Sequence, residues 1–132
     1  MKQRLVKEER KETELIVFLK AKLLTQYITR VSAGCDVKYR YSLLNKILNE
    51  CYDLLHLLFE ANEIDIKDEE RVKLIRQAIA RLKTIDFITS FATDVKCFTK
   101  HQGEVITMYS GDCYKYLLGY YNHSKSALVI QK

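Results

Sequence analysis

The sequence predicts an all-α protein, arranged as an antiparallel up-down-up-down four-helix bundle, from three observations. The 132 residues include no proline and only four glycines, so the residues that most often interrupt helices are nearly absent. Apolar residues recur at spacings of three and four, the period of a helix with one buried face. Short polar segments separate these stretches, and short connections make neighbouring helices antiparallel. We expect one domain over residues 1–132, long enough to bury its own core.

The periodic stretches predict helices over about residues 3–30, 38–62, 68–94 and 99–122, with a loose tail over 123–132. In the first helix the main apolar stripe is Ile16, Leu19, Leu23 and Tyr27, with Val17, Leu24 and Ile28 beside it. Gly34 follows as a plausible stop signal. In the second helix the stripe is Leu44, Ile47, Leu48, Cys51, Leu54, Leu55 and Leu58. Leu43 and Leu57 lie off it and predict a second contact face, toward a neighbouring helix or another subunit.

The third and fourth helices carry start signals as well as stripes. Asp68 and Thr99 are suitable N-caps. The inner stripe of the third helix is Ile75, Ala78, Leu82 and Ile85, continuing through Ile88 and Phe91. The fourth helix carries Val105, Ile106, Tyr109, Cys113, Tyr116, Leu117 and Tyr120.

The formal net charge of +5 and pI near 9.0 favour an acidic partner, most often nucleic acid. In an up-down bundle the first and third turns share one end, which brings together Arg30, Lys38, Arg40, Lys96 and Lys100. Residues 71–83 contain no acid and add a basic flank of Arg71, Lys73, Arg76, Arg81 and Lys83. The opposite end is acidic, with Glu60, Glu63, Asp65, Asp68, Glu69 and Glu70 around Lys67. In the stretch KYRY at residues 38–41, the rings of Tyr39 and Tyr41 either stack on nucleic-acid bases or pack against neighbouring helices.

The apolar runs are far shorter than the ~20 residues that a membrane span requires, so we expect no membrane partner. Near the N-terminus only five consecutive residues are apolar, too few for the core of a signal peptide. The four cysteines, Cys35, Cys51, Cys97 and Cys113, show no CxxC spacing. Together these features predict reduced thiols and a cytoplasmic protein.

No constellation of catalytic residues is recognisable, so we expect no enzyme, no catalytic residue and no cofactor. Cys97 and His101 are four residues apart, as metal ligands can be, but no further ligand accompanies them and we expect no metal site. His56 lies among leucines and is interpreted as a hydrogen-bonded residue at the edge of the core or an interface.

The fourth helix combines glycine with tyrosine. Gly103, Gly111 and Gly119 each cost about 1 kcal/mol relative to alanine inside a helix, which close helix approach would offset. Tyrosine is enriched at protein interfaces. We therefore predict that this helix contacts another subunit through Tyr109, Tyr114, Tyr116, Tyr120 and Tyr121.

Three stretches resemble a known family: 23–49, LLTQYITRVSAGCDVKYRYSLLNKILN; 58–63, LFEANE; and 98–122, FTKHQGEVITMYSGDCYKYLLGYYN. The resemblance is to the accessory variability determinant (Avd) proteins of diversity-generating retroelements, and to the related four-helix proteins encoded in rRNA intervening sequences. It implies a homopentameric barrel with a basic surface that binds a reverse transcriptase and its template RNA or cDNA and supports mutagenic reverse transcription without being the polymerase.

Two functions therefore compete. In the first, the chain is a non-catalytic, nucleic-acid-binding accessory subunit of a reverse-transcriptase complex. In the second, it is an oligomeric scaffold that binds only protein partners, or an intervening-sequence type of protein with another role.

Overall fold

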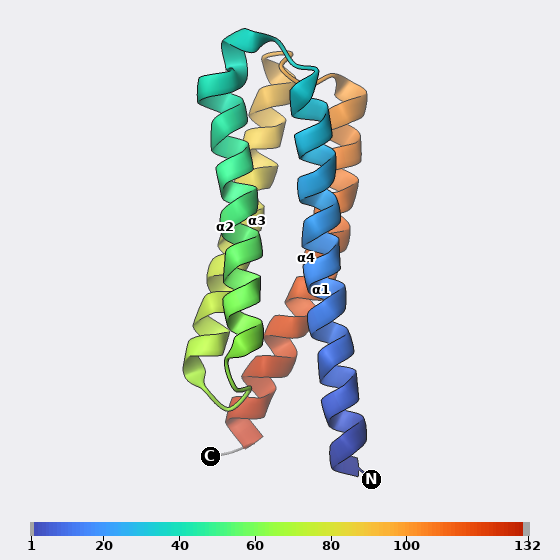
Figure 1. Ribbon diagram of the computed structural model, residues 1–132, viewed down its shortest axis with the longest axis vertical. Coiled ribbons are helices and arrows are strands. Elements are labelled where there is room, and N and C mark those ends of the chain that lie inside the picture. Colours follow the sequence, from blue (N-terminus) through green and yellow to red (C-terminus); the bar gives the residue numbers. More distant parts are fainter. Residues whose placement is uncertain (1, 131–132) are drawn as a thin grey trace.

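The computed structural model describes the backbone of residues 2–130 and the side chains of residues 12–129. Over this range the chain forms four α-helices: α1 (Lys2–Ala33), α2 (Asn45–Glu63), α3 (Glu69–Asp94) and α4 (Lys100–Ile130). The helices run side by side in alternating directions, so each connection lies at the end opposite to the previous one (Figure 1). Each helix packs against two others, α1 against α2 and α4, and α3 against α2 and α4. The predicted all-helical, antiparallel four-helix architecture is confirmed for these residues.

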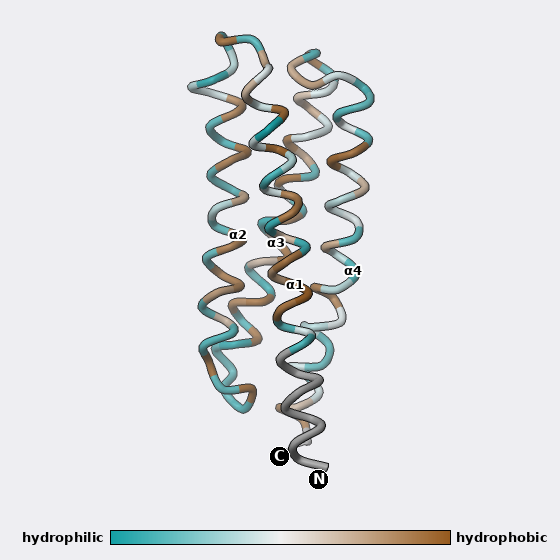
Figure 2. Tube along the Cα trace, turned by 45° about the vertical axis from the view of Figure 1, so that its right-hand side comes forward, coloured by the Kyte–Doolittle hydropathy of each residue, from teal (hydrophilic) through white to brown (hydrophobic). Residues whose placement is uncertain are grey.

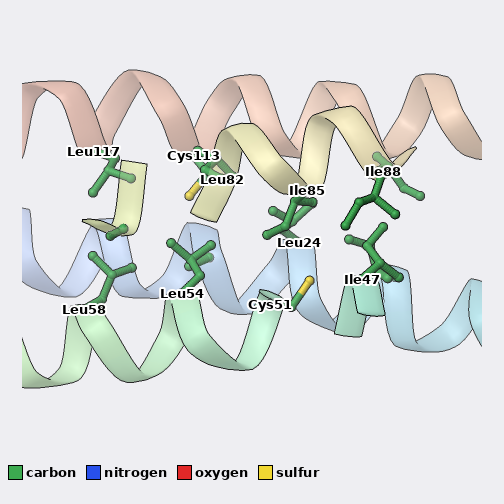
Figure 3. Packing of buried hydrophobic residues seen from close by; sticks show 14 of the residues in the cluster. Leu24, Ile47, Cys51, Leu54, Leu58, Leu82, Ile85, Ile88, Cys113 and Leu117 are labelled. Atoms are coloured by element: carbon green, nitrogen blue, oxygen red, sulfur yellow. The ribbon is translucent and has the colours of Figure 1, made fainter. Parts of the chain in front are cut away.

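The core lies along the bundle axis and takes side chains from all four helices. Leu24 of α1, Leu54 of α2, Leu82 of α3 and Leu117 of α4 are fully buried. Figure 3 shows these side chains converging between the helices, with Cys51 and Cys113 among them. In Figure 2 apolar positions recur along each described helix between hydrophilic ones, the pattern that directs one face inward.

In α1 the side that faces the core differs from the prediction. Val17, Leu24 and Ile28 are fully buried, whereas Ile16 is 37% and Leu19 51% exposed. The stripe that we expected to be secondary is therefore the inner one. Both stripes are apolar, and the choice between them depends on where α2 and α4 pack rather than on the period of α1.

The stripes of α2 and α3 agree with the prediction except at their edges. Leu48 and Leu55 of α2 are half-buried rather than buried. Leu43 of η2 and Leu57 of α2, which lie off the stripe, are also half-buried and pack against the core. The predicted inner stripe of α3 holds through Ile88, but Phe91 is 52% exposed and its assignment to the core is wrong.

The start of α2 is irregular where a regular helix from residue 38 was expected. A 3₁₀ turn, η1 (Val37–Tyr39), leads into a π-helical segment, η2 (Arg40–Leu44), and the α-helix begins only at Asn45. The Asp36 carboxylate begins the 3₁₀ turn by accepting a hydrogen bond from the Lys38 backbone N–H at 3.1 Å. The wider π turn accommodates an additional residue before regular α geometry is established.

The loose tail predicted for 123–132 is wrong for residues 123–130, because α4 continues to Ile130. Ser124 is fully buried in this extension, so the additional turns pack against the bundle. Residues 131–132 lie outside the described part of the chain.

Candidate nucleic-acid interface

The turn between α1 and α2 and the turn between α3 and α4 meet at one end of the bundle (Figure 1). The Tyr39 hydroxyl donates a hydrogen bond to the Val95 carbonyl at 3.1 Å, and the Cys35 thiol donates to the Cys97 carbonyl at 3.2 Å. These contacts join segments that are about sixty residues apart in sequence. They hold the basic residues of the two turns in one neighbourhood, which we call the basic end.

Five cationic side chains lie in the segments that form the basic end, and all five residues are exposed: Arg30, Lys38, Arg40, Lys96 and Lys100. None of them forms an ion pair with a carboxylate among the side chains of residues 12–129. The Lys38 ammonium lies over the ring of Tyr39, 5.0 Å from its centroid, so one half of the KYRY motif is a cation–aromatic pair. Tyr41 is 85% exposed and contributes a free ring surface.

Three carboxylates lie in the same region and make its potential uneven. Asp94 and Glu104 line a hollow between α3 and α4 together with Lys100. Asp36 is used as the cap of η1. Lys100 therefore faces acidic neighbours, and the positive charge of the basic end is strongest toward α1 and η2.

Side-chain caps fix where α3 and α4 begin. Thr99 and Gln102 form a reciprocal capping box: the Gln102 N–H donates to Thr99 Oγ1 at 3.1 Å, and the Thr99 N–H to Gln102 Oε1 at 2.9 Å. At the acidic end, the Glu70 N–H donates to Asp68 Oδ1 at 2.9 Å. Both predicted N-caps are confirmed.

Lys96 lies in the left-handed region with φ of 66°. The Lys96 N–H donates to the Thr93 carbonyl at 3.1 Å and the Cys97 N–H to the Ala92 carbonyl at 2.8 Å, which is the Schellman pattern at a helix C-terminus. Gly34, expected to stop the first helix, does follow Ala33, but its φ is not positive. The left-handed stop is thus at the end of α3 and is made by a lysine.

The basic flank on α3 is smaller than predicted. Lys73, Arg76 and Lys83 are exposed. The Arg76 guanidinium donates to the Tyr121 hydroxyl at 3.2 Å, and Lys125 lies 5.9 Å from the centroid of the same ring. The hydrogen bond from Arg76, together with the nearby positive charges, lowers the pKa of the Tyr121 phenol.

Arg81 is partly neutralised within the chain. Its guanidinium contacts both oxygens of Glu50 at 3.3 and 3.1 Å, and Lys46 also pairs with Glu50 at 3.0 Å. The Arg81 side chain retains 41% exposure, whereas the Glu50 side chain retains 3%. The main contact of the Arg81 guanidinium is therefore its ion pair with the buried Glu50 carboxylate.

Arg71 does not belong to an exposed flank, and its assignment as a surface cation is corrected. Its side chain is 2% exposed and donates to Glu14 Oε1 at 2.5 Å and to the Ile64 carbonyl at 2.8 Å. Its guanidinium lies 5.0 Å from the centroid of Tyr120, whose hydroxyl contacts Asn62 Oδ1 at 2.6 Å. We call this arrangement the Arg71 clasp, since it joins all four helices near the acidic end.

The tyrosines predicted to contact another subunit are largely occupied within their own chain. Tyr120 is 1% exposed, so it is corrected from an interface residue to a core residue. The other four are half-buried and pack against the core: Tyr109, Tyr114, Tyr116 and Tyr121. The ring of Tyr109, for example, packs in a tilted arrangement against Tyr27 of α1, with the ring centroids 5.5 Å apart. Contact of these four with a second subunit stays a prediction.

The glycines of α4 have different surroundings. A side chain at Gly103 would collide with Thr93 of α3, which shows that α3 and α4 approach closely there. At Gly111 and Gly119 an added Cβ would meet no atom within 4 Å. Close approach within the chain therefore explains only the first of the three glycines.

The residues weighed as chemical candidates are dispersed. His56 is exposed and contacts Glu60 at 2.7 Å, rather than lying at a core edge. Burial raises the pKa of the Cys97 thiol to about 12, with a further contribution from Cys35. Over the described residues, no group of three or more His, Cys, Asp and Glu side chains has an arrangement that could hold a metal ion.

Sequence reasoning missed Lys22, a cation that lies along α1 from the basic end. Lys22 shares a hollow beside α1 with Gln26, Thr29 and Arg30. These positions recur at spacings of three and four, so a polar stripe along the first helix was the signal that could have identified them.

The chain matches no protein-family model, and comparisons with curated proteins and with solved structures likewise find no match. In the described part of the chain, none of the helices combines the length and apolarity needed to cross a membrane.

Proposed function

We propose that this protein is a non-catalytic accessory factor that binds nucleic acid through its basic end. The observation that supports this most is the convergence of exposed cations from three segments, without carboxylate partners among the described side chains. Such side chains bind phosphates by releasing condensed counterions. Arg30, Lys38, Arg40 and Lys96 form the central contact, and Lys73, Arg76 and Lys83 extend it along α3.

The resemblance to accessory proteins of diversity-generating retroelements supplies the biological setting of this proposal. In that setting the partners are a reverse transcriptase, its template RNA or cDNA, and further copies of the chain in a homopentamer in the cytoplasm. The chain would then support mutagenic reverse transcription without carrying out the chemistry.

The competing proposal, an oligomeric scaffold for proteins alone, is favoured by one surface. Tyr39, Leu43, Phe91 and Val95 line a mostly apolar hollow of about 640 Å³ between η2 and the end of α3. Phe87, one turn before Phe91, is 74% exposed. A protein partner could bury these rings, and the two proposals are compatible if partner and nucleic acid use adjacent surfaces.

Charge reversal at the basic end distinguishes the two proposals. The double variant Lys38→Glu, Lys96→Glu should bind structured RNA at least about tenfold more weakly, with a shallower dependence of log affinity on log salt. The matched control Lys67→Glu, Lys115→Glu changes the net charge equally, away from this end, and should bind nearly as the unmodified protein does. Fluorescence anisotropy at several salt concentrations measures both. Equal losses in the two variants, or affinity independent of salt, would contradict the proposal.

A further inference from the structure

The seam between α1 and α2 contains a continuous groove. One hollow of about 570 Å³ is lined by Lys22, Thr25, Gln26, Thr29, Arg30 and Leu55. A second of about 300 Å³ shares Thr29 with the first and continues toward the basic end, past Leu48 and Asn45 to Arg40. In Figure 1 this seam faces the viewer, with α3 and α4 behind it. The groove thus begins at the basic end and extends along the seam as far as Lys22 and Leu55.

The groove is positively charged along its length. Lys22, Arg30 and Arg40 line it, and no carboxylate does. Lys22 and Arg30 are eight residues apart on α1, about 12 Å along the helix axis. All three residues are exposed and form no ion pair among the side chains described for residues 12–129. A chain of phosphates lying in the seam would therefore meet successive cations.

Aromatic rings lie beside the groove, on the same side of α2 as the leucines that line it. Leu48 and Leu55 of α2 line the hollows. Tyr52 and Phe59 follow them at spacings of four, which places all four residues on one side of α2. The two rings are 51% and 58% exposed, although each would be more stable covered. Cations in the groove and free rings beside it form the combination that binds unpaired bases by stacking while holding their phosphates.

We propose that the α1–α2 groove is a binding path for single-stranded nucleic acid. Phosphates contact Lys22, Arg30 and Arg40, and unpaired bases stack on Tyr52 and Phe59. The amides of Gln26 and Asn45 are placed to hydrogen-bond base edges. A duplex presents phosphates but no free base faces, so the groove favours single strands. This inference rests on the proposed function, since it names the form of nucleic acid that the basic end delivers into the seam.

Two variants at and beside the groove test the proposal against two control variants outside it. The probes are a labelled oligouridine of about 12 nucleotides and an RNA duplex of the same length. Lys22→Glu should weaken oligouridine binding at least about fivefold and lower the salt slope by about 0.7, whereas Lys67→Glu should do neither.

The double variant Tyr52→Ala, Phe59→Ala should weaken binding of the single strand about tenfold or more and leave binding of the duplex nearly unchanged, since base stacking contributes ~1–3 kcal/mol per base. Phe87→Ala, an exposed ring on α3, is the control for loss of an aromatic surface.

A reporter in the groove gives an independent measurement. The chain contains no tryptophan, so Tyr52→Trp introduces a single indole beside the seam. Its fluorescence should be quenched by oligouridine and recover as salt is raised, because stacking brings a base onto the ring. An indole unaffected by saturating oligouridine would overturn the stacking on which the proposal depends.

The outcomes of these experiments distinguish the groove proposal from the proposed function on which it rests. If the unmodified protein bound neither probe, both the groove proposal and the proposed nucleic-acid-binding function would be contradicted. If binding were lost in Lys38→Glu, Lys96→Glu but unchanged in Lys22→Glu and in the aromatic double variant, the basic end would remain the interface and the groove would be excluded. The groove would also be excluded as a nucleic-acid path if its variants lost binding of a protein partner but still bound the oligouridine normally.

Discussion

At the acidic end of the bundle Arg71 is enclosed and bound to Glu14 and to the Ile64 carbonyl, whereas Arg30 and Arg40 at the basic end are exposed and have no carboxylate partner among the described side chains. The first guanidinium holds helices together, and the other two leave their hydrogen-bond donors available. The two terminal nitrogens of Arg71 donate to Ile64 and Glu14, whereas its buried Nε has no hydrogen-bond partner among the described residues. A buried arginine is strongly destabilising when its charge is left unpaired, so the contact with Glu14 is essential to this arrangement. Arginine therefore serves this fold both as a buried link between helices and as an exposed charge.

Removing the buried guanidinium of Arg71 is the most direct test of this difference between the two ends. Arg71→Ala should lower the free energy of unfolding by about 3–5 kcal/mol, because it leaves Glu14 and the Ile64 carbonyl without their partner. Urea unfolding followed by circular dichroism measures the change. Arg76→Ala, on the exposed side of the same helix, is the control and should cost less than about 1 kcal/mol. Similar losses in the two variants would contradict the structural role of the clasp.

A smaller effect is expected from glycine replacement in α4 near the basic end. Gly103→Ala should destabilise the protein by about 1 kcal/mol or more, since the new methyl group must displace Thr93. Gly111→Ala, in the same helix but beside open space, should instead stabilise it by up to about 1 kcal/mol. Thermal unfolding of the two variants should give shifts of opposite sign. Shifts of the same sign would show that α3 and α4 do not approach closely at Gly103.

The helix caps test whether the two ends are equally stabilised by local hydrogen bonds. Thr99→Ala removes one bond of the capping box of α4 at the basic end, and Asp68→Ala removes the cap of α3 at the acidic end. Each should cost about 1 kcal/mol in urea unfolding. The two ends would then differ in exposed charge and in the clasp, but not in capping. A cost near zero for either variant would identify the end whose helix frays.

The smallest effect on stability is expected where the effect on binding is largest. Lys38→Glu, Lys96→Glu should change the free energy of unfolding by less than about 0.5 kcal/mol, since neither side chain has an ion-pair partner to lose among the side chains of residues 12–129. This measurement also verifies that any loss of RNA binding is not caused by unfolding. A loss of more than about 2 kcal/mol would show that these lysines are structural.

The short connections predicted the antiparallel order of the helices, and the residue types of Asp68 and Thr99 predicted both N-caps. The apolar period of the sequence was sufficient to predict the four helices. It was not sufficient to orient α1, because Val17 and Leu24 lie on one apolar stripe and Ile16 and Leu19 on another. Only the positions of α2 and α4 determine which stripe is covered. Phe91 illustrates the same limit at the end of α3, where the core closes before its ring is covered.

The candidate site could be predicted only in part, because it too depends on how the helices pack. The topology alone placed the first and third turns together, so the cations of the basic end could be grouped before any side chain was positioned. Whether a cation is free depends on contacts distant in sequence: Arg71 meets Glu14, 57 residues away, and Arg81 meets Glu50, 31 residues away. The groove depends on how closely α1 and α2 pack, which no local pattern encodes.

The stop at the end of α3 has a consequence for how this chain would evolve or be engineered. A left-handed backbone is strained for lysine and relaxed for glycine, so Lys96→Gly would be a stabilising exchange by about 1 kcal/mol. Selection for heat resistance alone would favour that exchange and thereby delete a positive charge from the basic end. Stability and affinity for polyanions are thus opposed at residue 96. A protein that retains the lysine there keeps the positive charge but has the less stable fold.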